Sequence, residues 1–207
     1  MVIGAGGQIP RYVIPLLQTQ PAITVTLFGR HADTLPYDGL RKITGQADQL
    51  SDLVEAMQGQ DIVYMNFDDK AITELVITAM HQTGIRRIIQ AGVLSVYGEV
   101  AETFAAWNTR MMGGAVAKGR GIEALEASDL DYVYLRMTWL YNGQRRDYVA
   151  SPKGAPFLGA QVTRKAIAQF VLDTLTGKRE DHRASIGLWE PGSEYKTKPD
   201  FYGGSSS

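Results

Sequence analysis

Glycines near the start of the chain form the segment best suited to chemistry. Apolar residues lead into the glycine cluster, and a segment with helical spacing follows it. A buried strand that turns tightly into a helix points free backbone N–H groups at a pyrophosphate, and glycine lets the backbone approach the phosphates closely. The spacing fits G-x-x-G-x-x-G through Gly4 and Gly7 with Pro10 in the last position, whereas the shorter G-x-G-x-x-G fails at Ile9. The predicted dinucleotide-binding turn consists of Gly4, Gly6, Gly7, Gln8 and Ile9.

A cation follows the second apolar run, which ends in Phe28 and Gly29. In a dinucleotide-binding sheet this point faces the adenosine ribose, where an acid favours NAD and an arginine favours the 2′-phosphate of NADP. Arg30 offers bidentate, charge-assisted contacts to that phosphate, and His31 adds to them. Asp33 is close enough in sequence to serve a ribose hydroxyl instead. We therefore predict NADP as the cofactor and keep NAD open.

Polar and aromatic residues follow the fourth apolar run, at the edge where ligands of parallel sheets lie. Asn66 either lines the cofactor crevice or caps the next helix, and the sequence favours neither role. Phe67 is expected to pack beside the ribose. Asp68 and Asp69 are expected only to cap the helix that follows.

The elements that must position these residues are short apolar runs alternating with longer segments at helical spacing, a pattern typical of βα units around a parallel sheet. We expect strands at 2–3, 24–28, 42–44, 61–65, 87–91, 132–135 and 184–188. Helical spacing marks segments starting at Pro10 and at 50–57, 72–83, 120–127 and 166–175. Asp48 is the expected N-cap of the second helix, Gly84 should end the third, and Pro15 should kink or loosen the first.

The pattern as a whole predicts the α/β class: one Rossmann-like domain with a doubly wound, mostly parallel sheet and a small C-terminal substrate region. The domain spans residues 1–202, and the Gly-Ser segment 203–207 is expected to be a flexible tail. Only three residues precede the glycine turn, fewer than a central strand usually has, so we expect that strand to be either clipped or continued upstream.

Composition narrows the class of protein. Hydrophobic residues make up 44% and charged residues 21%, as in soluble globular proteins, and the net charge of −1 argues against binding to nucleic acid or an anionic membrane. No apolar run approaches the roughly 20 residues of a membrane span, and no signal peptide is evident, so we expect a cytoplasmic protein. The chain has no cysteine, and its three histidines are far apart, so we expect no metal site. The expected partner is a small-molecule substrate, and the expected state is a monomer or homodimer.

Several blocks resemble the NmrA-like, NAD(P)H-binding branch of the atypical short-chain dehydrogenases/reductases. In order, they are residues 2–9, 84–89, 96–100, 107–108, 126–132, 135–140, 152–154 and 162–165. The resemblance implies a Rossmann-like sheet with the cofactor at the carboxyl ends of its strands. Arg120 stands where related proteins often have a lysine near the nicotinamide ribose, with Lys118 as the alternative. The resemblance also implies that Gly92 and Met137 border the nicotinamide end, Gly92 in the segment where the family places a serine.

A catalytic set cannot be carried over from the family. Short-chain dehydrogenases use a serine and a Tyr-x-x-x-Lys pair, in which the lysine lowers the pKa of the phenol that exchanges a proton with the substrate. None of the ten tyrosines here has a lysine four residues later. Tyr97 is the remaining candidate proton donor, although the sequence favours a packed aromatic at this position.

The sequence therefore leaves two functions open. In the first, the protein is an NADP-preferring oxidoreductase that transfers hydride to a small carbonyl, quinone or flavin-like acceptor, with solvent or Tyr97 supplying the proton. In the second, it is a non-catalytic NADP(H) redox sensor that acts through a protein partner. The missing tyrosine–lysine pair favours the sensor, whereas an acceptor that needs no strongly activated acid favours the enzyme.

Overall fold

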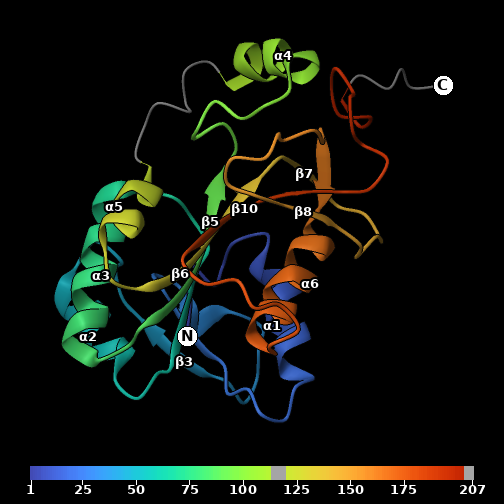
Figure 1. Ribbon diagram of the computed structural model, residues 1–207. Coiled ribbons are helices and arrows are strands. Elements are labelled where there is room, and N and C mark those ends of the chain that lie inside the picture. Colours follow the sequence, from blue (N-terminus) through green and yellow to red (C-terminus); the bar gives the residue numbers. More distant parts are fainter. Residues whose placement is uncertain (113–119, 203–207) are drawn as a thin grey trace.

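The computed structural model describes residues 1–112 and 120–202, and its centre is an eight-stranded sheet (Figure 1). From one edge to the other, the strands are β3 (Arg41–Thr44), β2 (Thr26–Gly29), β1 (Val2–Ile3), β4 (Ile62–Met65), β5 (Arg87–Val93), β6 (Asp131–Met137), β10 (Ala184–Trp189) and β8 (Val149–Pro152). All neighbours are parallel except β10 and β8. The order reverses direction beside β1, which makes the carboxyl ends of β1 and β4 the place where a Rossmann sheet binds its ligand. The expected α/β class is confirmed.

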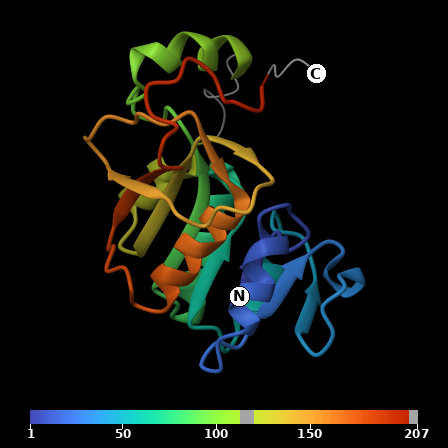
Figure 2. The same ribbon diagram turned by 90° about the vertical axis from the view of Figure 1, so that its right-hand side faces the viewer.

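Helices cover both faces of this sheet (Figures 1 and 2). On one face α1 (Pro10–Gln18) packs against α6 (Arg164–Leu175), and on the other α3 (Lys70–Thr83) packs against both α2 (Leu50–Met57) and α5 (Gly121–Ala127). The two largest apolar clusters divide in the same way, one beneath each helical layer. Strands covered on both faces are mostly apolar, which is why these runs show little alternation in the sequence.

A smaller region stands above the carboxyl ends of the strands (Figure 1). It contains α4 (Glu102–Met112) and a two-stranded parallel sheet of β7 (Trp139–Tyr141) and β9 (Gln161–Thr163). A third apolar cluster, which includes Phe104, Phe157 and Trp189, lies here. The expected substrate region was assigned to the C-terminal part alone, but α4 comes from the middle of the chain.

The ends of the helices test several local expectations. Pro10 is the first residue of α1 as predicted, and the helix continues through Pro15 to Gln18. Gly84 adopts the left-handed conformation after α3, with φ +78°, and ends the helix as predicted. The predicted cap at Asp48 is wrong: Gln49 occupies the N-cap of α2 and makes no side-chain hydrogen bond there.

Three further expectations concern the undescribed residues, membrane-spanning helices and the short first strand. Lys118 and the segment 203–207 lie outside the described residues. None of the helices within 1–112 and 120–202 is long and apolar enough to cross a membrane. β1 has only two residues, yet both pair with β2 on one side and β4 on the other.

Candidate cofactor site

The glycine cluster forms a tight turn between β1 and α1. Gly4 has φ +76°, which favours glycine, and its N–H donates to the carbonyl of Phe28 at 3.0 Å. The N–H of Gly7 donates to the carbonyl of Gly4, also at 3.0 Å. Ile9 occupies the N-cap of α1 without a side-chain capping bond. The helix therefore begins with backbone donors that no side-chain cap takes up, the arrangement that binds a phosphate.

Two side chains from the end of β4 pack onto this turn. A Cβ atom on Gly7 would lie 2.2 Å from Nδ2 of Asn66, and one on Gly4 would lie 3.1 Å from the ring of Phe67. The hydroxyl of Tyr64 donates to Oδ1 of Asn66 at 3.0 Å and fixes the amide. The N-cap of α3 is Asp69, so Asn66 does not take the capping role that the sequence left open for it.

Two adjoining cavities flank the turn at the end of β2. One, of about 210 Å³, is lined by the glycine turn together with Arg30, His31 and Leu35. The other, of about 360 Å³, lies between Phe67 and the segment after β3, and it also reaches Arg30. Gly4, Gly29 and Arg30 line both cavities, so Arg30 lies where the two adjoin. The first cavity has two potential cations and no carboxylate among its lining residues, which suits a phosphate.

A third cavity, of about 240 Å³, lies further along the same edge of the sheet, after β5 and β6. It is lined by Gly92, Val93, Leu94, Asn108, Met112, Met137, Thr138, Trp139 and Leu140. Gly92 is required here because a Cβ atom would lie 2.0 Å from the ring of Tyr134. The structure thus brings Gly92 and Met137 together as the resemblance implied. The three cavities follow the carboxyl ends of the strands from β2 to β6, the path that an elongated dinucleotide takes.

Tyr97 and Arg120 line none of these three cavities. The hydroxyl of Tyr97 donates to Oε1 of Glu126 at 2.6 Å, and Nζ of Lys153 donates to the same oxygen at 2.8 Å. Burial, together with the bond to Glu126, raises the pKa of Tyr97 well above its ordinary value. Arg120 donates from its guanidinium to the carbonyl of Val96 at 3.0 Å. Tyr97 is thus hydrogen-bonded to Glu126, and Arg120 is hydrogen-bonded to the loop after β5.

Asp68 lies at the same carboxyl edge of the sheet, and the sequence did not reveal its role. It was expected to cap α3, but Asp69 does so by accepting from the N–H of Ile72. Asp68 instead accepts from the hydroxyl of Tyr134 at 2.6 Å, and from the N–H of Gly121 at 2.8 Å.

Burial raises the pKa of Asp68, although the hydrogen bonds that it accepts act against this shift. Gln90 donates to the same carboxylate at 3.1 Å. The carboxylate therefore joins the segment after β4 to the middle of β5, the middle of β6 and the start of α5. A glutamine inside an otherwise apolar run, as at Gln90, is the signal that could have pointed to a buried polar network.

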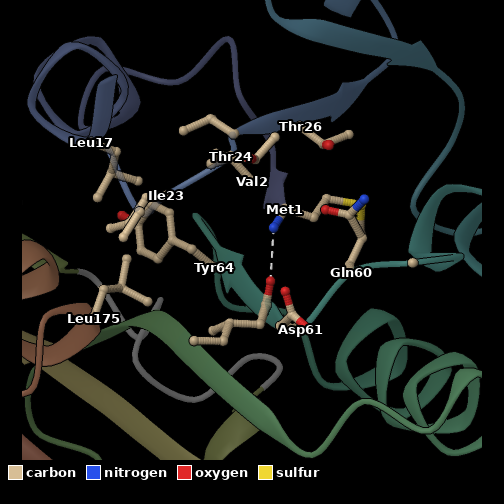
Figure 3. Close-up of a pocket in the computed structure, with 14 residues that line it drawn as sticks. Met1, Val2, Leu17, Ile23, Thr24, Thr26, Gln60, Asp61, Tyr64 and Leu175 are labelled. Atoms are coloured by element: carbon tan, nitrogen blue, oxygen red, sulfur yellow. Dashed lines mark hydrogen bonds between the residues drawn. The ribbon is translucent and has the colours of Figure 1, made fainter. Parts of the chain in front are cut away.

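Another cavity lies at the opposite edge of the sheet, near the amino ends of β1 and β4 (Figure 3). Its volume is about 290 Å³, and Met1, Thr24, Asp61 and Tyr64 are among its lining residues. The amino nitrogen of Met1 donates to the carbonyl of Ile62 there at 2.7 Å. None of the predicted site residues lines it, so it is not part of the candidate site.

Comparison with known proteins gives the family context. A family model described as NAD(P)H-binding matches residues 4–178. A short-chain dehydrogenase/reductase from Veillonella parvula DSM 2008, solved in complex with NADP, is 30% identical with a TM-score of 0.90, and the match covers 97% of each chain. A Rossmann-fold NAD(P)-binding family protein from Shigella flexneri is 32% identical with a TM-score of 0.78, covering 97% of this chain and 96% of that one.

More distant structures share the fold. An anaerobillin reductase from Escherichia coli O157:H7 is 22% identical with a TM-score of 0.72, and the match covers 92% of this chain and 96% of that chain. No curated protein matches the chain.

Proposed function

The chain belongs to the NAD(P)H-binding family of atypical short-chain dehydrogenases/reductases, and from this premise we propose that it is an NADP-preferring oxidoreductase of the NmrA-like type. Its acceptor is a small carbonyl, quinone or flavin-like compound. The observation that carries the proposal is the line of cavities along one sheet edge, with Arg30 at one end and an apolar cavity beside Gly92 and Met137 at the other.

Arg30 and His31 support NADP over NAD. Both line the cavity beside the glycine turn, where an arginine can hold a 2′-phosphate through two charge-assisted hydrogen bonds. Asp33, the residue that kept NAD open, accepts from the hydroxyl of Thr44 at 3.2 Å. The NADP complex of the Veillonella parvula relative points the same way.

Each part of the site has a role in this proposal. The turn from Gly4 to Ile9 binds the pyrophosphate through backbone N–H groups, and Asn66 and Phe67 keep the turn in place. When bound, NADPH supplies the hydride. The third cavity holds the acceptor next to Gly92 and Met137 and excludes water through its apolar wall. With the hydroxyl of Tyr97 bonded to Glu126, the proton comes from solvent, which suffices for a quinone or flavin acceptor.

One observation favours a second candidate, a redox sensor that binds NADP(H) without turnover. The chain lacks the Tyr-x-x-x-Lys pair, and Tyr97, the tyrosine that follows β5, donates to the Glu126 carboxylate and has a raised pKa. Binding alone needs neither group. The two candidates share the cofactor site and differ only in whether the third cavity accepts a reducible molecule.

An acceptor screen separates these candidates. Purified protein is given NADPH and a panel of quinones, flavins and aldehydes, and NADPH oxidation is followed at 340 nm, a wavelength set by the nicotinamide. The oxidoreductase proposal requires oxidation with at least one member. Complete inactivity across the panel, with NADPH bound in a parallel titration, would instead support the sensor.

A further inference from the structure

Among the described residues that line the third cavity, the polar side chains are those of Asn108 and Thr138. Most of its wall is aliphatic, aromatic or thioether, from residues such as Leu94, Met112 and Met137. The hydroxyl of Thr138, the other polar side chain there, donates to the carbonyl of Gly159 at 3.3 Å. A ligand in this cavity therefore meets few polar groups, and what Asn108 offers decides what it recognises.

The orientation of the Asn108 amide is fixed by Trp139. The indole Nε1 donates to Oδ1 of Asn108 at 2.9 Å. An indole N–H can only donate, so the amide atom that faces it must be the oxygen, and the NH₂ group must point the other way. The indole is itself held in edge-on contacts with Trp107, at 4.9 Å between ring centroids, and with Tyr202, at 5.6 Å. The aromatic cluster thus sets the direction of the amide.

The NH₂ group of Asn108 is left for a ligand. Asn108 is only 3% exposed, and among residues 1–112 and 120–202 no acceptor bonds its Nδ2. Within that part of the chain, the buried polar side-chain atoms that lack a partner are Nε of Arg136 and Arg164 and Oγ of Ser185. Nδ2 of Asn108 is not one of these fully buried atoms without a partner. It therefore keeps some accessible surface, which faces the cavity that Asn108 lines.

We infer that Asn108 is the specificity-determining residue of the acceptor cavity and that its Nδ2 donates to a carbonyl oxygen of the acceptor. The inference rests on the proposed function, which it deepens by restricting the acceptor to compounds with a carbonyl group on an apolar frame. A quinone fits this description. Its reduction to the hydroquinone consumes NADPH and one proton from water, and the electron pair reaches the oxygens, where an N–H donor stabilises the charge that develops.

Menadione, an apolar quinone, tests the inference by binding as well as turnover. Its affinity for the protein saturated with NADP⁺ is measured from quenching of tryptophan fluorescence. In Asn108→Asp one carboxylate oxygen still accepts from Trp139, while the other replaces the NH₂ donor with a negative acceptor. We expect the dissociation constant for menadione to rise at least ~10-fold and that for NADPH to stay within about twofold, because only one hydrogen bond is replaced by repulsion.

Two further variants complete the experiment, one as a control and one as a second test of the inference. Asn142→Asp makes the same change at an asparagine outside the cavity, where Oδ1 accepts from Tyr12 and Arg164, and should leave menadione binding unchanged. Trp139→Phe removes the indole N–H and frees the amide to turn, so a loss of a few-fold is expected even if Asn108→Asp fails to fold.

The outcomes separate the inference from the function on which it rests. If menadione binds the unaltered protein and weakens in Asn108→Asp, the inference stands, and a lack of turnover would then count against the oxidoreductase proposal alone. If menadione binds both proteins equally, or binds neither, the inference is overturned. Turnover of another acceptor in that case would still support the oxidoreductase.

Discussion

Arg30 is the residue on which the choice of cofactor depends. Its side chain is exposed at the end of β2 and lines the cavities on both sides of Gly4 and Gly29. We predict that Arg30→Ala weakens NADPH binding by ~10- to 100-fold, since a charge-assisted hydrogen bond contributes about 1.5–3 kcal/mol. NADH, which lacks the phosphate, should lose little. Parallel titrations of both nucleotides, followed by cofactor fluorescence, give the two ratios.

Arg41→Ala is the matched control for this prediction. Arg41 is also exposed, but it begins β3 and pairs with Thr26, at the opposite end of the strands from the site. Arg41→Ala should change neither the affinity for NADPH nor the affinity for NADH. Equal binding of NADPH and NADH by the unaltered protein would contradict the role given to Arg30.

Gly7 is required for space rather than for backbone conformation. Its φ is not among the positive values, so alanine is free of backbone strain, but the new Cβ would stand 2.2 Å from Nδ2 of Asn66. We predict that Gly7→Ala pushes this amide aside and weakens NADPH binding by ~10-fold, about 1.4 kcal/mol. In an Asn66→Ala background, Gly7→Ala should weaken NADPH binding by a smaller factor. Strictly additive losses in the double-mutant cycle would mean that the two residues do not act together.

The sequence predicted single residues well where local geometry governs them. Gly4 must adopt a positive φ and Gly92 must leave room for a ring, and both demands are visible as glycines at the ends of strands. Tyr97 was harder to interpret, because its partners Glu126 and Lys153 are 29 and 56 residues away, and only tertiary structure brings them together.

At the scale of elements, seven of the eight strands of the main sheet were predicted, because most of them are buried and leave apolar runs in the sequence, whereas β8 was missed. The region that forms the third cavity was not predicted. Only Phe104 and Asn108 of α4 are buried, so its helical stripe is faint, and β7 and β9 have three residues each. β8 ends in Pro152 at the sheet edge, where a missing N–H is tolerated. Such short elements depend on contacts with the rest of the molecule.

Glu126 connects three elements, because it extends from α5 to Tyr97 after β5 and to Lys153 after β8. Partial burial pushes its pKa upward, but the hydrogen bonds from Lys153 and Tyr97 outweigh this and leave the pKa below its ordinary value. A carboxylate with a lowered folded-state pKa stabilises the protein above its unfolded-state pKa, and this contribution is lost as the pH falls through the folded-state pKa.

We therefore predict that Glu126→Gln lowers the melting temperature at pH 7 by a few degrees, for a loss of about 1 kcal/mol. The difference between the variant and the unaltered protein should shrink as the pH falls from 5 to 3, because the unaltered carboxylate becomes protonated. Thermal unfolding followed by circular dichroism over this range checks the trend. A difference that is constant with pH would mean that the charge of Glu126 is irrelevant to stability.

At the scale of the whole molecule, Arg136 connects the main sheet to the region above it. Its side chain is fully buried on β6, and its guanidinium pairs with Glu99 at 3.1 Å. It also donates to the carbonyls of Ser151 at 2.9 Å and Ser185 at 3.3 Å. Glu99 in turn accepts from the backbone N–H groups of the loop after β5, at residues 95 and 97. One buried ion pair thus fixes the loop, β8 and β10 relative to β6.

We predict that Arg136→Leu destabilises the protein by ~3–5 kcal/mol, because it leaves the Glu99 carboxylate buried without its partner. Urea unfolding monitored by tryptophan fluorescence measures the change. The double variant Arg136→Leu/Glu99→Gln removes the stranded charge and should recover part of the loss. If the double variant is less stable than Arg136→Leu, the penalty does not come from an unpaired carboxylate.

The doubly wound, mostly parallel sheet was predicted from the alternation of apolar runs and helical segments, but the set of residues that lines the third cavity was not. It combines Gly92 from β5, Met137 from β6 and Asn108 from α4, and no spacing in the sequence relates them. In the sequence, Asn108 stands out only as part of a block that resembles the family. Its role depends on the indole of Trp139, 31 residues later, which only the folded chain brings to it.

A crystal structure of the protein with NADP⁺ would show whether the carboxyl edge from β2 to β6 is one dinucleotide site that ends in an acceptor cavity. We predict electron density for the pyrophosphate on the turn from Gly4 to Ile9, for the 2′-phosphate at Arg30, and for the nicotinamide beside Gly92 and Met137. Density for NADP⁺ at another edge of the sheet, or a nicotinamide turned away from Met137, would contradict this prediction.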